Sequence, residues 1–402
     1  MNIVKKIYCR VFQSCMKLVI PILPYHQPKL IDGFENLPEV LKKEKKSRII
    51  IVTDPVISKL GLLDGLKAVL EKNDINFCVY DKTTPNPTTD NVEEALALYK
   101  ENNCQAIIGF GGGSSLDCAK GLGIRITYPK KNLDHFKGIL KVARKIPLLI
   151  AVPTTAGTGS ETTLAAVIRN TATKQKYAIN SFPLIPTYAV LEPKVTLSLP
   201  ANITSTTGMD ALTHAVEAYI GRSSTKKTRK YSLDATKLIF ENIEEVFTNG
   251  SNEEARKNML QASFYAGCAF TVSYVGYVHA IAHSLGGFYN TPHGLANSII
   301  LPVMLKAYGK HAWKKLAELA VVAGIADGSE SHQEAANKFI AAIEEKNKKF
   351  GIGTSFPEIK AEDIPELSKH ADKEANPLYP VPILWNAKEL EHFYYELMPN
   401  NN

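Results

Sequence analysis

The first half of the chain alternates short apolar runs with amphipathic segments. Four runs have the continuous apolar character of strands buried on both faces of a parallel sheet: 48–54, 76–80, 106–110 and 148–153. Between them, segments 56–72 and 90–102 repeat apolar side chains at helical spacing. This alternation predicts a Rossmann-like parallel sheet with helices on both faces.

The second half has a different pattern. Beyond Pro200 the segments are long, Ala-rich and helix-periodic, and they cover residues 203–221, 229–248, 253–272, 296–308, 311–324 and 332–349. No convincing strand pattern follows Leu191. The predicted fold class is therefore α/β followed by all-α. We expect an N-terminal arm over 1–28, a nucleotide-binding α/β domain over 29–197 and a helical domain over 198–402.

The N-terminal arm needs separate treatment because its residues 11–23 are fairly apolar and follow basic residues. Polar side chains interrupt the run and Pro21 ends it, so it does not have the pattern of a signal peptide. It is also too short to span a bilayer. We expect an amphipathic helix that packs on the body or on a subunit partner, with shallow membrane association as the alternative.

Composition narrows the class of protein. The chain is 45% hydrophobic and 22% charged, which is typical of a globular protein with a large core. Its net charge of +7 is spread along the chain, with no basic stripe interleaved with aromatic residues, so we expect no nucleic-acid partner. The six cysteines form no CxxC pair. Reduced cysteines and a cytoplasmic location are therefore expected.

Glycines and hydroxyls follow two of the predicted strands. Gly111, Gly112 and Gly113 lead into Ser114 and a helix start, where free backbone N–H groups favour a phosphate. The spacing is neither GxGxxG nor a Walker loop. A second loop, 154–161, also follows a strand and is rich in threonine and glycine. Asp54, after the first strand, suits either a ribose hydroxyl or a simple helix cap.

Metal-ligating side chains gather in two windows of the helical half. Asp210 and His214 are four residues apart, so both project from one helical face, and His279 and His283 repeat that spacing. His293 follows Pro292 at a loop or helix start. These are five candidates for the usual four positions, and the spacing alone does not exclude His283. One carboxylate with imidazoles suits Fe²⁺ or Zn²⁺.

These stretches together resemble the iron-containing (group III) alcohol dehydrogenases, from about residue 30 to the C-terminus. The resemblance rests on Asn86-Pro-Thr88, Gly109-Phe-Gly-Gly-Gly-Ser114 with Asp117 and Lys120, Pro153-Thr-Thr-Ala-Gly-Thr-Gly-Ser-Glu161, Gly208-Met-Asp-Ala-Leu-Thr-His214, His279-Ala-Ile-Ala-His-Ser-Leu-Gly286 and Asn290-Thr-Pro-His-Gly294. It implies the dehydroquinate synthase-like fold.

The resemblance also implies roles for individual residues. The metal ligands would be Asp210, His214, His279 and His293, which leaves His283 near the nicotinamide as a proton relay. The cofactor contacts would be Asp54, Asn86, Gly112, Gly113, Ser114, Thr154, Thr155, Thr158, Lys176 and Leu191. Phe270 would form a wall of the substrate pocket.

Three features depart from the family pattern. Ser115 stands where the family often has proline, at what we take to be the first position of a helix. Ser284 replaces the usual proline after His283, and the first 25 or so residues match no pattern of the family.

The functional hypothesis is a metal-dependent dehydrogenase that transfers hydride between NAD(H) and a small primary alcohol, diol or aldehyde, with Fe²⁺ as its metal and Zn²⁺ as the alternative. We expect a homodimer with no membrane span. The alternative is an NAD-using lyase or cyclase, or a polyol dehydrogenase, of the same fold. Those relatives have a three-ligand metal site, and His214 as a fourth ligand argues against them.

Overall fold

The structure is a computed structural model that describes residues 1–399. The chain divides into two compact units. One, here called the sheet unit, consists of Pro24–Ser198. The other, the helical unit, combines Met1–Leu23 with the chain from Leu199 onward. Residues 1–23 of the N-terminal arm thus belong to the same unit as the C-terminal helices, whereas residues 24–28 belong to the sheet unit.

The sheet unit contains a six-stranded sheet in the order β1-β9-β6-β4-β2-β3, in which every neighbouring pair is parallel. Its strands are β1 (Lys29–Asp32), β2 (Arg48–Val52), β3 (Asn76–Tyr80), β4 (Ala106–Gly111), β6 (Leu148–Pro153) and β9 (Tyr188–Leu191). A smaller sheet, which the sequence pattern did not predict, has the order β5-β8-β7 and consists of β5 (Gly138–Ile139), β7 (Ala165–Arg169) and β8 (Lys176–Asn180).

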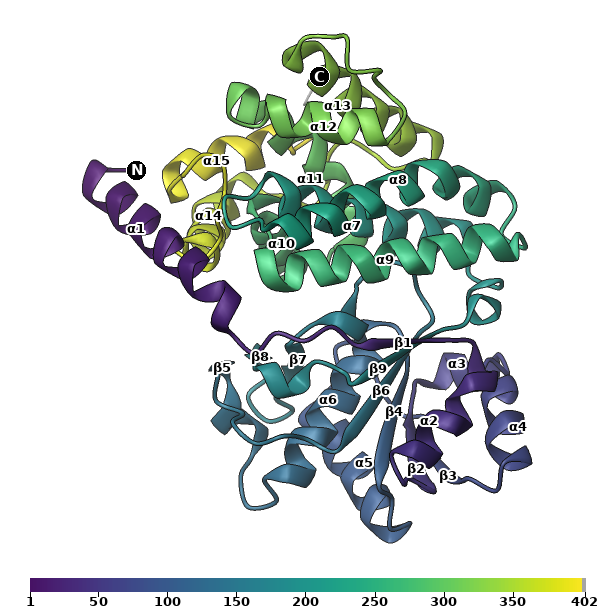
Figure 1. Cartoon of the computed structure of the whole chain (residues 1–402). Coiled ribbons are helices and arrows are strands. Elements are labelled where there is room, and N and C mark those ends of the chain that lie inside the picture. The colour runs from purple at the N-terminus through teal and green to yellow at the C-terminus, as the bar shows by residue number, and fades with distance from the viewer. Residues whose placement is uncertain (400–402) are drawn as a thin grey trace. The chain divides into compact units, whose positions relative to one another are not determined.

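Helices cover both faces of the larger sheet, as its apolar strands require. They are α2 (Leu37–Lys43), α3 (Pro55–Lys59), α4 (Asp64–Lys72), α5 (Thr89–Glu101) and α6 (Gly113–Thr127). Along β2 the side chains alternate between two cores. Ile50 and Val52 pack in one core with residues of α5 and α6, whereas Ile49 and Ile51 pack in the other with residues of α2 and α4. Figure 1 shows α5 and α6 on one side of the sheet and α2 and α4 on the other.

One helix prediction in this unit is wrong. The helix expected over 56–72 is two helices, α3 and α4, because the chain turns through Gly61 at a φ of 69°. The predicted strands at 48–54, 76–80, 106–110 and 148–153 are present with shifts of a residue or two at their ends. No strand follows Leu191 among the described residues.

The helical unit contains ten helices among the described residues. They are α1 (Ile3–Val19), α7 (Ala201–Ile220), α8 (Lys226–Thr248), α9 (Glu253–Ser273), α10 (Tyr277–Tyr289), α11 (His293–Tyr308), α12 (Trp313–Val322), α13 (His332–Lys349), α14 (Ile364–Ala375) and α15 (Ala387–Glu396). The sequence pattern did not predict α14 or α15. No described helix is long and apolar enough to cross a membrane.

Candidate metal centre and nucleotide loops

The metal candidates begin on α7, the most enclosed helix of the helical unit. It packs against α8, α9 and α11, and every residue from Gly208 to Ile220 is buried. Asp210 and His214 therefore leave the helix inside the unit rather than at its surface. A polar group in such a place must find a hydrogen-bond partner or a metal ion, because burying it alone is costly.

Two other helices bring imidazoles to the same point. His279 is a buried residue of α10, and His293 is the first residue of α11. Next to it, Gly294 lets α11 approach α7 closely, since a Cβ at this glycine would lie only 2.6 Å from the backbone oxygen of Thr206. Any larger residue would push His293 away from Asp210.

The four residues form one cluster. One ligand atom from each of Asp210, His214, His279 and His293 lies within 4.8 Å of the others. His293 Nε2 is 3.5 Å from Asp210 Oδ1, and His214 Nδ1 is 4.0 Å from the same oxygen. A carboxylate and three imidazoles that converge in this way are suitable donors for a divalent transition metal.

Glu217, which the sequence reasoning missed, holds His279 in place. Its Oε2 lies 2.6 Å from His279 Nδ1, and the carboxylate also accepts hydrogen bonds from the backbone N–H groups of Gly276 and Val278. Burial raises the pKa of Glu217 to about 7, although the hydrogen bonds that the carboxylate accepts act to lower this pKa. A carboxylate on Nδ1 fixes the ring so that Nε2 faces the cluster. An acid in the apolar run 215–220, three residues after His214, was the available signal.

Burial also acts on His279 itself. It lowers the pKa of His279 well below the usual value, and the neighbouring His214, His293 and His283 add to the effect. The imidazole is therefore neutral at physiological pH, which is the form that ligates metal ions.

Asn297 is a second buried partner that the sequence reasoning missed. It lies one turn after His293 on α11, and its Nδ2 donates to Asp210 Oδ1 at 2.7 Å. The same nitrogen is 3.2 Å from His279 Nε2 and 3.1 Å from His293 Nε2. The amide thus touches three of the four residues of the cluster and positions the carboxylate among the imidazoles.

His283 lies beside the cluster but is not one of its four residues, and its hydrogen-bond partner is Glu374. Its ring stacks on His293, with centroids 5.1 Å apart, and its Nδ1 lies 2.6 Å from Glu374 Oε1 on α14. Burial opposes ionisation of Glu374, but the charge and hydrogen bond of His283, together with a hydrogen bond from Tyr379, lower its pKa. His283 is 44% exposed, so this pair is in contact with solvent.

Phe270 of α9, expected as a wall of the substrate pocket, packs directly on a ligand candidate. Its ring stacks on His214 with centroids 4.1 Å apart and an angle of 14° between the planes. Such a contact gives this side of the cluster an apolar surface and limits rotation of the imidazole.

In the sheet unit, the expected cofactor residues follow the carboxyl ends of parallel strands. Asp54 comes after β2, the glycine loop after β4 and the threonine loop after β6, while Leu191 ends β9. The chain leaves β2 toward β3 and returns to β4 on the other side, so the strand order reverses between β2 and β4. Open parallel sheets bind their ligands at such a point.

The glycine loop and the threonine loop lie against each other. A Cβ at Gly112 would be 3.7 Å from Thr155 Oγ1, and one at Gly113 would be 3.6 Å from Thr158 Cγ2. The backbone N–H of Thr154 donates to Gly111 O. Gly111 itself has a φ of 147°, which disfavours any side chain. Ser114 stands in the first turn of α6, where backbone N–H groups are unpaired.

Lys120 explains why the threonine loop keeps its shape. Its buried Nζ on α6 donates to Ser160 O, Thr163 Oγ1 and Ala165 O at 2.7–2.8 Å. Asp117, one turn earlier, accepts from Ser160 Oγ. Burial lowers the pKa of Lys120 to about 8, against the charges of Asp117 and Glu161. The helix that follows the first loop therefore holds the second.

Three of the expected contacts already have protein partners. Asp54 is the N-cap of α3, with Oδ1 accepting from the backbone N–H groups of Val56 and Ile57, while Ser115 Oγ donates to its Oδ2 at 3.4 Å. Lys176 Nζ donates to Asn86 Oδ1 at 2.6 Å. The cap role considered for Asp54 is thus present through Oδ1, while Oδ2 lies beside Ser115 of α6.

Two of the departures from the family pattern have structural consequences. Ser115 is the third residue of α6 rather than its first, because the helix begins at Gly113. Ser284 lies inside α10, donates to Ile281 O and contacts the hydroxyl of Tyr394 at 2.6 Å. Helix α10 therefore continues past His283 and is linked to α15.

Comparison with known proteins identifies the family. Residues 31–193 match the iron-containing alcohol dehydrogenase family, and residues 204–398 match the C-terminal part of the Fe-containing alcohol dehydrogenase family. The chain belongs to this family. It is an oxidoreductase of the alcohol dehydrogenase class with the dehydroquinate synthase-like fold, and the resemblance stated from the sequence is confirmed.

Named relatives cover nearly all of the chain. The 1,3-propanediol dehydrogenase of Klebsiella pneumoniae is 38% identical over 89% of this chain and 92% of its own length. The NAD-dependent methanol dehydrogenase of Bacillus methanolicus is 35% identical over 82% and 87%. A crystal structure of a 1,3-propanediol oxidoreductase superposes with a TM-score of 0.89, at 35% identity over 93% and 99%. These relatives are all dehydrogenases or oxidoreductases, and none supports the lyase or cyclase alternative.

Proposed function

We propose that this dehydrogenase interconverts a small primary alcohol or diol and its aldehyde, with NAD(H) as the hydride carrier and a divalent metal held by Asp210, His214, His279 and His293. The observation that carries the proposal is the convergence of these four donors within 4.8 Å. Fe²⁺ is the expected ion and Zn²⁺ the alternative, since this donor set suits both. The helical unit would bind the metal and the sheet unit the nucleotide.

The donor set fits a divalent ion in several respects. Glu217 and Asn297 orient the ligands, and His279 is neutral. When bound, the metal would supply Lewis-acid polarisation of the alcohol oxygen, and the nicotinamide would accept the hydride. Phe270 would keep the His214 side of the site apolar.

The hydroxyl proton needs a route to solvent. We assign this step to His283, whose Nδ1 is held by Glu374 and whose side chain is partly exposed. A carboxylate on Nδ1 stabilises the imidazolium that forms when the ring accepts a proton. In this proposal the pair stores the proton at His283 and releases it to water.

The sheet unit would bind NAD(H) through the two loops. Gly112, Gly113 and Ser114 would receive the pyrophosphate at the start of α6, with Thr154, Thr155 and Thr158 on the opposite side. Asn86, Lys176 and Leu191 complete the proposed contacts. Leu191 ends a neighbouring strand of the same sheet, and Lys176 already holds the amide of Asn86.

A substrate panel tests the activity. Protein loaded with Fe²⁺ or with Zn²⁺ is expected to reduce NAD when given methanol, ethanol, butanol, 1,2-propanediol or 1,3-propanediol. The reaction is followed by NADH absorbance, and the better ion identifies the working metal. Absence of turnover with every alcohol, diol and aldehyde under either metal would overturn the proposal. Ultracentrifugation of the same protein tests the expected homodimer.

Asp54 tests the choice of nucleotide. Its carboxylate would hydrogen-bond the ribose 2′-hydroxyl and repel a 2′-phosphate, so the unmodified protein is expected to prefer NAD over NADP. In Asp54→Asn the helix cap is kept while the charge is lost, so NADP use should rise without loss of stability. Asp54→Gly also removes the cap oxygen. Equal use of NADPH by the unmodified protein would contradict this assignment.

A further inference from the structure

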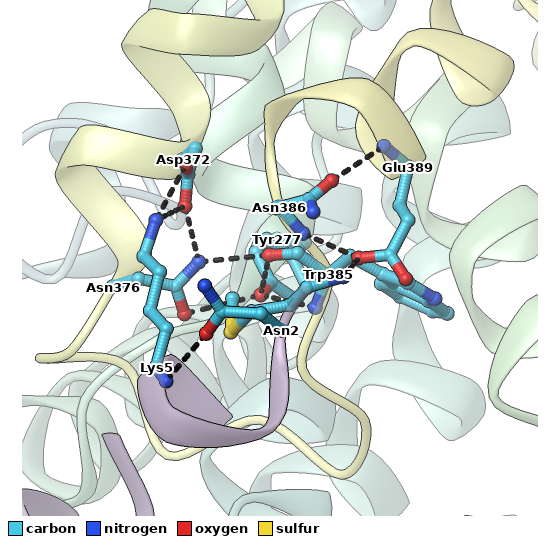
Figure 2. Close-up of polar contacts among 9 residues, drawn as sticks. Asn2, Lys5, Tyr277, Asp372, Asn376, Trp385, Asn386 and Glu389 are labelled. Carbon is cyan, nitrogen blue, oxygen red and sulfur yellow. Dashed lines mark hydrogen bonds and ion pairs between the residues drawn. The ribbon is translucent and has the colours of Figure 1, made fainter. Parts of the chain in front are cut away.

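The N-terminal helix α1 packs on the helical unit through its polar face. Lys5 Nζ is 2.9 Å from Asp372 Oδ2 (Figure 2). Arg10 donates to the backbone oxygens of Val381 and Pro382, and Gln13 donates to Tyr379 O at 2.7 Å. In Figure 2, Asn2 caps the start of this helix beside the segment that carries Trp385 and Asn386.

The opposite face of α1 is apolar and exposed. Val4, Tyr8, Val11 and Leu18 are 57–79% exposed, and their spacing of three, four or seven residues places them on one side. Ile22, just beyond the end of the helix, is 80% exposed. Ile3 and Ile7 widen this stripe. An amphipathic helix on a protein surface normally turns its apolar side to the core. Here the orientation is inverted, and contiguous apolar surface of this kind indicates a binding face.

The charged side chains of α1 itself are all of one sign. Residues 1–23, which belong to the helical unit, contain Lys5, Lys6, Arg10 and Lys17 but no aspartate or glutamate. Two copies of the arm that paired along the stripe would bring these cations together with no acidic residue of the arm to offset them. The charge pattern therefore favours an anionic partner over a second copy of the chain.

A groove beside α1 has the same character. It has a volume of about 470 Å³ and is lined by the cations Lys6, Arg10 and Arg222 together with His311 and by Ile7, Val11, Pro382, Ile383 and Leu384. No carboxylate is among the described residues that line it. The wall is thus basic at some points and apolar at others, as a phospholipid headgroup and its glycerol region require.

Several cationic side chains of the helical unit lie near one another beside α1. Burial, together with the nearby charge of Arg222, lowers the pKa of Arg10 to about 10. Burial, and then the charges of Arg229 and Lys17, lower the pKa of Lys315 to about 8, against the charge of Glu318. An anion bound in the groove would relieve this repulsion.

We propose that α1 is an interfacial anchor that places the helical unit on an anionic phospholipid bilayer. The apolar stripe enters the boundary between headgroups and acyl chains, while the groove beside it binds a lipid phosphate through Lys6, Arg10 and Arg222. An apolar face flanked by cations is the arrangement that lies in the plane of a membrane surface. This inference is independent of the substrate and of the proposed metal.

Vesicle co-sedimentation of the full chain tests the anchor. Binding to vesicles of phosphatidylcholine with phosphatidylglycerol should be at least about tenfold tighter than to phosphatidylcholine alone, and it should weaken as salt is added. Failure to bind the anionic vesicles overturns the proposal. So does equal binding to both kinds of vesicle, because the basic groove would then have no role.

Two variants locate the binding face. Leu18→Asp places a charge on the stripe and should reduce binding about tenfold or more. Its matched control is Val321→Asp on α12, an exposed apolar residue of the same unit, which should bind as the unmodified protein does. Arg222→Gln should reduce the preference for anionic vesicles while leaving the stripe intact. The rate of alcohol oxidation should be unchanged in Leu18→Asp, Val321→Asp and Arg222→Gln, and this measurement serves as the control for correct folding.

The alternative occupant has a distinct outcome. If a second copy covered the stripe, Leu18→Asp would lower the oligomeric state in analytical ultracentrifugation, and the unmodified protein would not sediment with any vesicle. That result would overturn the anchor. Binding of inorganic phosphate at the groove without vesicle binding would overturn it as well.

Discussion

The metal cluster of the helical unit and the nucleotide loops of the sheet unit are organised in different ways. The cluster depends on functional groups, because Asp210 and three imidazoles converge and Glu217 and Asn297 orient them. The loops depend on space and backbone, since glycines at the start of α6 leave room beside Thr155 and Thr158. We therefore expect metal binding to depend on the functional group of a substituted side chain in the cluster. Nucleotide binding should depend on the size of a side chain substituted in the loops.

The largest expected effect comes from His279→Ala. Removing one ligand should lower kcat/KM about 10³-fold or more, because Lewis-acid polarisation supplies several kcal/mol to the transition state. NADH affinity, measured by fluorescence titration, should stay within about twofold because the loops are in the other unit. His392→Ala on α15 is the matched control, with a side chain that is 78% exposed. A loss of NADH affinity in His279→Ala would contradict the expectation that the metal cluster and the nucleotide loops act separately.

Glu217→Gln tests whether orientation of the ligand matters. The amide keeps the size of the side chain but loses the charge that holds His279 Nδ1, so metal affinity should fall about 10–100-fold. Competition with a chelator measures this directly, and the pH profile of kcat should shift while circular dichroism does not. Glu318→Gln, which removes the charge that accepts from the Tyr219 hydroxyl, serves as control. Unchanged metal affinity would show that Glu217 is only structural.

Gly112→Ala should act on the nucleotide alone. The added Cβ meets Thr155 at an ordinary contact distance of 3.7 Å, so the fold should tolerate it. It occupies space that a pyrophosphate needs, and the Kd of NADH in calorimetry should rise about tenfold. Metal content should not change. Gly65→Ala, whose Cβ would be 3.6 Å from Phe34, is the control. Unchanged NADH affinity would place the phosphate elsewhere.

The smallest effect concerns the stability of the threonine loop. Burial raises the pKa of Glu161 from 4.5 to about 7, so the native state binds more protons than the unfolded state between these values. The stability that protonated Glu161 contributes is fully present below pH 4.5, the pKa of this group in the unfolded chain. It is lost as the pH rises through about 7, the pKa in the native state. Glu161→Gln should therefore be more stable than the unmodified protein at alkaline pH, by about 1–3 kcal/mol, with no such gain in acid.

Melting temperature measured across this pH range checks the prediction. In the variant, Lys120 keeps its bonds to Ser160, Thr163 and Ala165, and its charge still has Asp117 at 4.0 Å. The same pH dependence in both proteins would show that Glu161 does not titrate in this range.

Much of the sheet unit was predictable because its pattern is local. Strands buried on both faces, such as β2 and β4, must be apolar throughout, and this is visible in a few residues. The break between α3 and α4 was missed because both helices carry apolar residues in nearly continuous register. Helices α14 and α15 were missed even though both are amphipathic and α15 has a capping box.

The sequence by itself determined which residues are candidates for the metal, because the i,i+4 spacing of Asp210 with His214 places both on one helical face. It did not separate His283 from the ligands without the family resemblance. The tertiary structure decided which carboxylates pair with His279 and His283. Glu217 and His279 are 62 residues apart, and His283 and Glu374 are 91 apart, so no local period links them. The inverted orientation of α1 is also a tertiary fact. Its apolar period is visible in the sequence, but contacts with distant residues determine which face is exposed.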